Sequence, residues 1–213
     1  MTRFCLEARE GLCLVDRFSL QQPLRVDFVG GGYGYRLRRG GGRQEMLAKA
    51  VGAKPGLKVV DATAGLGRDA FLLAHLGCEV VLLERSPVIA ALLRDGLERA
   101  LAHEDTAEAA ARMRLLQVEA VHHLAHSDEA PGVIVLDPMF PSRTKSALVK
   151  GEMQMLQRFL GTDEDTDALL EAALASGAGR VVVKRPLKAP VNYGKKPSYD
   201  LRGRSSRFDV FVQ

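Results

Sequence analysis

Residues 133–141 have the sequence Val133-Ile134-Val135-Leu136-Asp137-Pro138-Met139-Phe140-Pro141, an apolar run that stops at an acid and two prolines. Four apolar, largely β-branched residues in a row are typical of a strand buried on both faces of a parallel sheet. Pro138 ends such a strand because it has no backbone N–H to donate. Ligands bind at the carboxyl ends of strands in open α/β sheets, so Asp137, Pro138 and Phe140 are our candidate catalytic residues. Considered alone, the segment fits an ordinary proline turn equally well.

Strand-like and helix-like segments alternate along most of the chain after residue 56. The predicted strands are residues 57–63, 78–85, 113–120, 133–136 and 180–184. The predicted helices are residues 69–76, 88–101, 146–160 and 165–176, preceded by a short helix at 44–51. This alternation implies right-handed crossovers and a mostly parallel sheet with helices on both faces, which is an α/β fold.

Both ends of the chain depart from this alternation. Residues 198–204 and 207–212 are strand-like with only Ser205-Ser206 between them, which predicts a C-terminal hairpin that adds an antiparallel edge to the sheet. A parallel core of five strands followed by such a hairpin is the shape of class I (Rossmann-like) methyltransferases. Residues 4–29 alternate loosely and predict short strands or a hairpin. We therefore divide the chain into a β-rich lead with glycine-rich segments, residues 1–52, and a class I methyltransferase domain, residues 53–213.

The composition limits the class of protein. With 213 residues, 46% hydrophobic and 26% charged, the chain is long enough for one globular domain with a large core. It contains no apolar run of about 18 residues and no signal-peptide pattern, so we expect a cytoplasmic protein without a membrane partner. Its three cysteines form no Cys-x-x-Cys pair, and no cysteine or paired acid completes a ligand set with His122, His123 and His126. We therefore expect neither a disulfide framework nor a bound metal.

Basic residues concentrate in two segments, although the net charge is only +4. One group lies among glycines near the N-terminus and the other near the C-terminus: Arg36, Arg38, Arg39 and Arg43, then Lys184, Arg185, Lys188, Lys195, Lys196, Arg202, Arg204 and Arg207. A solvated basic face explains either group if it stands alone. Beside a pocket that holds a nucleobase, the same residues would form a phosphate-binding rim.

A glycine loop, Asp61-Ala62-Thr63-Ala64-Gly65-Leu66-Gly67-Arg68-Asp69, joins the first predicted strand of the sheet to a helix. Gly65 and Gly67 let the backbone approach a ligand closely, and the helix N-terminus presents free N–H groups. The glycine spacing also matches a dinucleotide-binding fingerprint. Asp61 favours a different ligand, because its carboxylate suits the ammonium of a bound amino acid and would repel a pyrophosphate.

Glu84 ends the second predicted strand, where a carboxylate can accept both ribose hydroxyls of a nucleoside. NAD enzymes use an acid at the same place, so Glu84 does not separate the two cofactors. Asp61 and Asp137 together favour S-adenosylmethionine, with an NAD-dependent oxidoreductase as the alternative. Val121 and His122 follow the third predicted strand, at the height where adenine would lie.

Several long motifs resemble the ribosomal RNA small subunit methyltransferase J family. They are Asp61 to Phe71, Leu83-Glu84-Arg85, Leu136 to Pro141, Lys145 to Lys150 and Val182-Val183-Lys184-Arg185-Pro186, with glycine segments at Val26 to Gly31 and Gly40 to Arg43. The resemblance runs from about Val26 to the end of the chain. Members of the family usually have a longer N-terminal lead, and tend to show two serines where this chain has Val121-His122.

The resemblance implies an enzyme that uses S-adenosylmethionine to methylate the exocyclic N2 amine of one guanine in 16S rRNA, with the rRNA or the small ribosomal subunit as partner. With the loop residues, the expected cofactor contacts are Asp61, Gly65, Gly67, Arg68, Asp69, Glu84, Arg85, Val121, His122 and Asp137. The expected RNA contacts are Lys145, Lys150, Lys184 and Arg185. An ion-paired helix cap also explains Arg68 and Asp69, and a solvated helix face also explains the lysines.

The expected chemistry depends on positioning. The N2 amine is a poor nucleophile, so Asp137 would accept its N–H bonds and orient its lone pair, while Phe140 would stack on an extruded base. An amino-methyltransferase acting on adenine, cytosine or a protein glutamine would use the same acid, proline and aromatic residue. A non-catalytic RNA-binding module is the remaining alternative.

Overall fold

The computed structural model describes residues 2–30, 42–127, 130–138, 151–161, 165–189, 195–204 and 206–213. Three of the residues predicted for the site, Phe140, Lys145 and Lys150, lie outside these ranges. So do Arg36, Arg38 and Arg39 of the N-terminal basic group.

Seven strands of the described chain form one sheet, in the order β5-β4-β3-β6-β7-β9-β8. Their bounds are β3 Lys58–Asp61, β4 Glu79–Leu83, β5 Met113–Leu116, β6 Val133–Leu136, β7 Arg180–Pro186, β8 Tyr199–Arg202 and β9 Ser206–Val212. The first five are parallel, whereas β9 pairs antiparallel with both β7 and β8. The predicted parallel core with a C-terminal antiparallel hairpin is confirmed.

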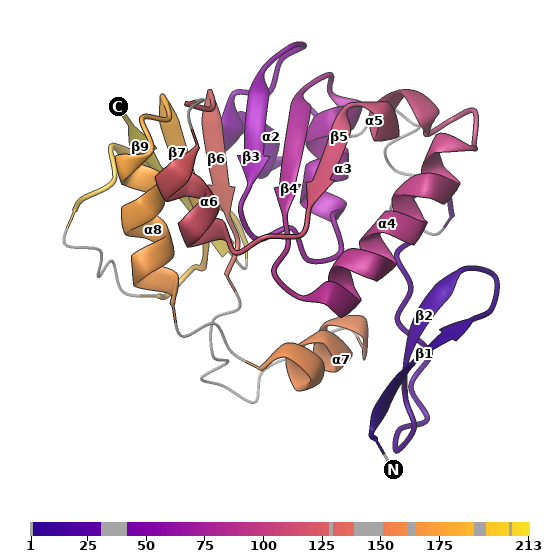
Figure 1. Cartoon of the computed structure of the whole chain (residues 1–213). Helices are drawn as coiled ribbons and strands as arrows, with labels where there is room; N and C mark the ends of the chain where they lie inside the picture. The colour runs from indigo at the N-terminus through magenta and orange to yellow at the C-terminus, as the bar shows by residue number, and fades with distance from the viewer. Residues whose placement is uncertain are drawn as a thin grey trace.

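Helices cover both faces of this sheet (Figure 1). Their bounds are α2 Met46–Val51, α3 Arg68–His75, α4 Pro87–Leu101, α5 Ala107–Ala111, α6 Ala120–His126, α7 Gly151–Leu160 and α8 Thr166–Ala175. Strand β6 shows why the sheet needs two layers: Val133 and Val135 belong to the core shared with α2 to α5, while Ile134 and Leu136 belong to the core shared with α6 and α8. Alternate side chains of a strand point to opposite faces, so a run without polar residues is buried on both.

The structure differs from the sequence prediction around the third parallel strand. The predicted strand 113–120 is wrong beyond Leu116, because Ala120 already begins α6. Glu119 caps this helix, and its carboxylate accepts the backbone N–H groups of Val121 at 3.0 Å and His122 at 2.7 Å. Such a cap satisfies N–H groups that the first helical turn leaves without a partner. Helix α5 was also absent from the prediction.

The lead forms the predicted hairpin, in which β1 (Phe4–Ala8) and β2 (Leu12–Asp16) pair antiparallel. The chain after the hairpin packs into the core beside the sheet, where Phe28 stacks on Phe71 of α3 with ring centroids 4.6 Å apart. In Figure 1 the hairpin lies near α7, below the edge where the parallel strands end. Within the described ranges, no helix is both long and apolar enough to cross a membrane.

Candidate active site

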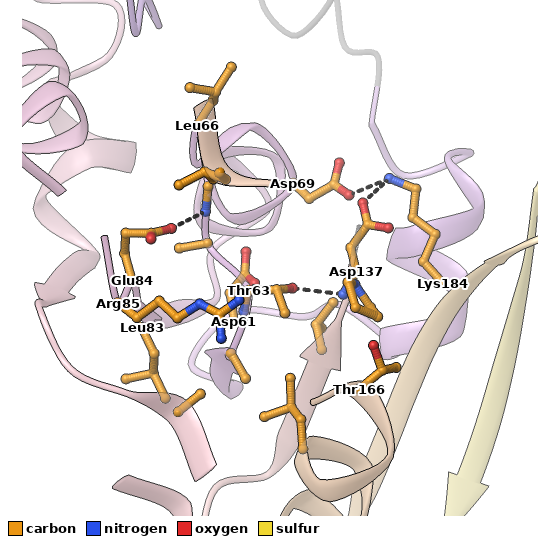
Figure 2. Close-up of a pocket in the computed structure, with 18 of the residues that line it drawn as sticks. Asp61, Thr63, Leu66, Asp69, Leu83, Glu84, Arg85, Asp137, Thr166 and Lys184 are labelled. Carbon is orange, nitrogen blue, oxygen red and sulfur yellow. Dashed lines mark hydrogen bonds and ion pairs between the residues drawn. The ribbon is translucent and has the colours of Figure 1, made fainter. Parts of the chain in front are cut away.

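A cavity of about 510 Å³ opens where the parallel strands end. Its wall comes from the carboxyl ends of β3, β4, β6 and β7 and from the segments after β3, β4, β5 and β6, completed by side chains of α7 and α8. Figure 2 shows polar side chains from four of these segments turned toward the same space. The size is in the usual range for a small-molecule or cofactor site, roughly 300 to 1,000 Å³.

The two glycines of the loop after β3 are needed for different structural reasons. Both have positive φ, +51° at Gly65 and +69° at Gly67. A Cβ atom at Gly67 would lie 2.7 Å from Leu93 and 3.2 Å from Phe28, so core packing excludes a side chain there. A Cβ atom at Gly65 would have only the Thr63 carbonyl within 4 Å, at 3.8 Å. The absence of a side chain at Gly65 therefore leaves space in the cavity, while the absence of one at Gly67 lets α3 pack against the core.

Glu84 connects the end of β4 to the glycine loop. Its buried carboxylate accepts the backbone N–H of Gly65 at 3.0 Å and that of Ser86 at 2.7 Å. These bonds fix the orientation of the carboxylate at the cavity wall, as Figure 2 shows. A carboxylate held in this way is suited to accept the hydroxyls of a ribose.

Asp61 ends β3 and is buried at the floor of the cavity, where it accepts the N–H of Thr63 at 3.1 Å. Burial raises the pKa of its carboxyl from 3.8 to about 7, and the nearby Asp69 and Asp137 also raise it. A cation bound beside Asp61 would stabilise the charged form and lower this pKa. The site is therefore prepared for a positively charged group.

Three charged side chains meet on the other side of the cavity. The Lys184 ammonium donates to Asp137 Oδ2 at 2.7 Å and to Asp69 Oδ2 at 2.9 Å (Figure 2). The backbone N–H of Asp137 donates to the Thr63 hydroxyl at 2.7 Å, which holds this residue at the end of β6. Burial raises the pKa of Asp137, and the charge of Lys184 opposes that rise. Burial lowers the pKa of Lys184, but the two carboxylates outweigh it, so the net pKa is raised.

Lys184 and Arg185 were predicted as RNA contacts, and the structure places both in the cavity wall. Lys184 faces carboxylates, and the Arg185 side chain is buried near the ion pair of Arg207 with Asp209, whose atoms are 2.8 Å apart. Burial lowers the pKa of Arg185. Contact of either residue with RNA phosphates stays a prediction, and neither presents an open basic surface here.

Two arginines predicted to contact the cofactor make ion pairs at the rim. Arg68 pairs with Glu152 of α7 at 2.6 Å, and Arg85 pairs with Asp165, at the start of α8, at 2.8 Å. Both arginines line the cavity. These pairs join the start of α3 to α7, and the segment after β4 to the start of α8.

Val121 and His122, by contrast, do not line the described cavity. They lie in the first turn of α6, and His122 stacks on His126 with ring centroids 4.3 Å apart. The segment after β5 lines the cavity with residues just before them, Val118, Glu119 and Ala120.

Some of the residues that line the cavity were not predicted from the sequence. One is Thr63, whose hydroxyl accepts the backbone N–H of Asp137; the signal for it in the sequence is a hydroxyl residue between Asp61 and Gly65. Met153, Leu156, Gln157 and Leu160 of α7 also line the cavity, and nothing in their helical pattern pointed to it. Among the residues that the structure describes, no group of histidines, cysteines and acids could hold a metal ion.

The cavity residues fit S-adenosylmethionine. Glu84 presents an oriented carboxylate that can accept ribose hydroxyls, and Asp61 presents a buried carboxylate that can pair with an ammonium. Leu66, Leu83 and Val118 also line the cavity and give it apolar surface. A pyrophosphate in the same place would meet carboxylates, a repulsion that disfavours NAD.

Comparisons with known proteins agree with this fit. A family model described as "Putative SAM-dependent methyltransferase" matches residues 3–213. Ribosomal RNA small subunit methyltransferase J of Stutzerimonas stutzeri is 59% identical over 192 residues, which cover 89% of this chain and 74% of that protein. The protein of the same name from Pseudomonas aeruginosa PAO1 is 58% identical over the same shares.

A solved structure shows the same architecture. The crystal structure of a SAM-dependent methyltransferase from Neisseria gonorrhoeae matches with a TM-score of 0.74 and 36% identity, covering 95% of this chain and 79% of that one. Sequence relatives, family model and fold thus agree. The chain belongs to the ribosomal RNA small subunit methyltransferase J family of SAM-dependent methyltransferases.

Proposed function

We propose that this protein transfers a methyl group from S-adenosylmethionine to the exocyclic N2 amine of a guanine in 16S rRNA. The observation that supports it most is the position of Asp137, which shares one cavity with Asp61 and Glu84, so an amine acceptor and the cofactor can be held side by side. The names of its relatives supply the rRNA substrate. The choice of guanine N2 follows the family resemblance. Since the substrate is ribosomal RNA, we assign the protein to the cytoplasm.

Cofactor binding depends on residues of the loops after β3 and β4. Glu84 orients the ribose, and Asp61, with Asp69 nearby, attracts the ammonium. S-Adenosylmethionine supplies a methyl group that its sulfonium has already activated. The main task of the protein is therefore to place the acceptor amine in line with that group.

Acceptor binding depends on Asp137. Its carboxylate accepts an N–H of the guanine amine and so turns the nitrogen lone pair toward the methyl group. The buried Pro138 fixes the chain direction directly after it. We propose that Phe140 stacks on the base, which has to leave its helix to enter the cavity, and that Lys145 and Lys150 contact the RNA backbone.

The test supplies methyl-labelled S-adenosylmethionine with small ribosomal subunits, naked 16S rRNA or DNA, followed by nucleoside analysis. We expect label in N2-methylguanosine from one rRNA substrate and none in DNA. The Asp137→Asn variant serves as the control, since it keeps the shape of the side chain and removes its charge; it should lose transfer by a factor of about 100 or more. Labelled methyladenine or methylcytosine would instead identify one of the related amino-methyltransferases.

The same preparation separates the remaining alternatives. Tight NAD binding without S-adenosylmethionine binding would support an oxidoreductase. RNA binding without methyl incorporation into any substrate would support a non-catalytic module.

A further inference from the structure

Lys184 lies where three elements meet. It belongs to β7, Asp137 follows β6, and Asp69 is in the first turn of α3. Its ammonium bonds to both carboxylates, at 2.7 Å and 2.9 Å, although they are 47 and 115 residues away in the sequence. Figure 2 shows the lysine side chain directed across the cavity wall toward these acids.

This arrangement differs from that of a lysine that contacts a phosphate backbone. Only 30% of the Lys184 side chain is exposed, and two of its three N–H bonds are directed at carboxylates. Charge-assisted bonds of this kind hold their partners more firmly than neutral ones. In the part of the chain that the structure describes, Asp137 Oδ2 is bound by Lys184, and no donor is bound to Oδ1.

We propose that Lys184 is a positioning residue for methyl transfer: it holds the Asp137 carboxylate by one oxygen, keeps it ionised and leaves the other oxygen for the acceptor amine. This inference rests on the proposed function, because it assigns a role within the same reaction. It replaces contact with RNA phosphates as the main role of Lys184.

The chemical reason lies in the charge on Asp137. In the transfer, the amine lone pair forms the new C–N bond, the electrons of the C–S bond go to sulfur, and the amine proton leaves to Asp137 or to water. An ionised Asp137 can accept the amine N–H before transfer and the proton after it, whereas a protonated carboxyl cannot perform this role.

Asp137 shares the cavity with other carboxyls, of which Asp61 and Asp69 interact with it electrostatically. The charged groups that face it are Asp61 on β3, Asp69 on α3 and Lys184 on β7. Removal of the ammonium leaves Asp61 and Asp69 facing Asp137 without the cation that binds it, and like charges favour the protonated form. Asp137 would then hold its proton to a higher pH.

The experiment compares Lys184→Met with Lys188→Met. Both changes remove one positive charge from neighbouring positions, but Lys188 is exposed and has no assigned ion pair in the described structure. In Lys184→Met, we expect the midpoint of the acid side of the pH profile of kcat to shift to higher pH by at least 1 unit. At pH 7, kcat should be about tenfold lower than in the wild type. Lys188→Met should keep the wild-type limb, and Lys184→Arg should restore part of the loss.

A contrary result has a clear form. If Lys184→Met keeps the acid limb but raises KM for RNA and flattens its salt dependence, then Lys184 contacts phosphates and the proposal is wrong.

A second readout needs no activity. The ¹³C signal of the Asp137 carboxyl, assigned by its loss in Asp137→Asn, is followed against pH in the unliganded protein. We expect a higher midpoint in Lys184→Met than in the wild type and Lys188→Met; an unchanged midpoint overturns the proposal. Lys184→Gln provides the same titration if the Met variant does not fold. Absence of methyl transfer by the wild type would refute the proposed function instead, so the two failures are distinguishable.

Discussion

The two halves of the cavity are built by different means. In the half after β3 and β4, backbone conformation determines the shape: Gly65 and Gly67 have positive φ, and backbone N–H groups bind Glu84. In the half at the ends of β6 and β7, side-chain charges determine the shape of the cavity, because the Lys184 ammonium bonds to both Asp137 and Asp69. The glycine loop should therefore respond mainly to changes in side-chain volume, and the buried acids of the cavity, including Asp61, mainly to changes in charge and pH.

The largest expected effect separates the two glycines of the first half. Gly67→Ala adds a Cβ atom 2.7 Å from Leu93 at a φ of +69°. We expect it to lower the free energy of unfolding by about 3 kcal/mol, the sum of overpacking and backbone strain. Gly65→Ala makes only an ordinary contact, with the Thr63 carbonyl at 3.8 Å, so it should lower the free energy of unfolding by about 1 to 2 kcal/mol, from backbone strain alone.

Urea denaturation at constant pH measures both losses, and calorimetric titration with S-adenosylmethionine completes the comparison. Gly65→Ala should remain folded but bind the cofactor more weakly, because its methyl group narrows the cavity. Equal destabilisation of the two variants would contradict the different roles that we give these glycines.

The next effect tests the charge of the cavity through Asp61. The pKa of its carboxyl is about 7 in the folded protein, against an ordinary value of 3.8. Between these values the folded state binds more protons than the unfolded chain, so this group costs stability as the pH rises from about 4 to 7. Asp61→Asn should therefore stabilise the unliganded protein at pH 8, by a few kcal/mol in order of magnitude, and change it little at pH 4.

Cofactor binding by the same variant should change in the opposite direction. At pH 8 Asp61→Asn removes the carboxylate that attracts the ammonium, so we expect the dissociation constant for S-adenosylmethionine to rise about tenfold. Chemical denaturation and calorimetry at the two pH values measure these changes. A stability gain that is the same at both pH values would show that Asp61 does not titrate as described.

The smallest effect concerns the ion pair at the outer rim. The side chains of Arg85 and Asp165 are 49% and 40% exposed, so water screens their attraction. Asp165→Asn, which keeps a residue suited to the helix N-cap, should lower the free energy of unfolding by less than about 1 kcal/mol. A double-mutant cycle with Arg85→Met isolates the pair. A coupling free energy well above about 1 kcal/mol would mean that this exposed ion pair stabilises the protein as strongly as a buried one.

Much of this cavity could be predicted from the sequence because its acids stand at strand ends. The apolar runs before Asp61, Glu84 and Asp137 predicted parallel strands, and the carboxyl ends of such strands share one edge of the sheet. The end of β5 at Leu116 was harder to predict, because Val118 continues the apolar pattern beyond it. The cap residue Glu119 is the signal that could have corrected it.

The partners of Lys184 could not be predicted in this way. Its position at the end of a predicted strand, beside Arg185, was interpreted as part of a basic surface, because a sequence shows charge but not which way a side chain turns. Pairing with Asp69 and Asp137 depends on the strand order, which places β7 next to β6 and β6 next to β3. Only the folded chain brings these three residues together.

The length of β6 has a consequence for insertions and deletions. Its four residues alternate between two cores, and Asp137 follows directly, fixed by its bond to Thr63. One added residue would exchange the two sides of the strand and shift the carboxylate by about 3.3 Å along it. Substitutions among Val, Ile and Leu should be tolerated here far better than any change in residue number. In this strand, the count of residues matters more for catalysis than their identity.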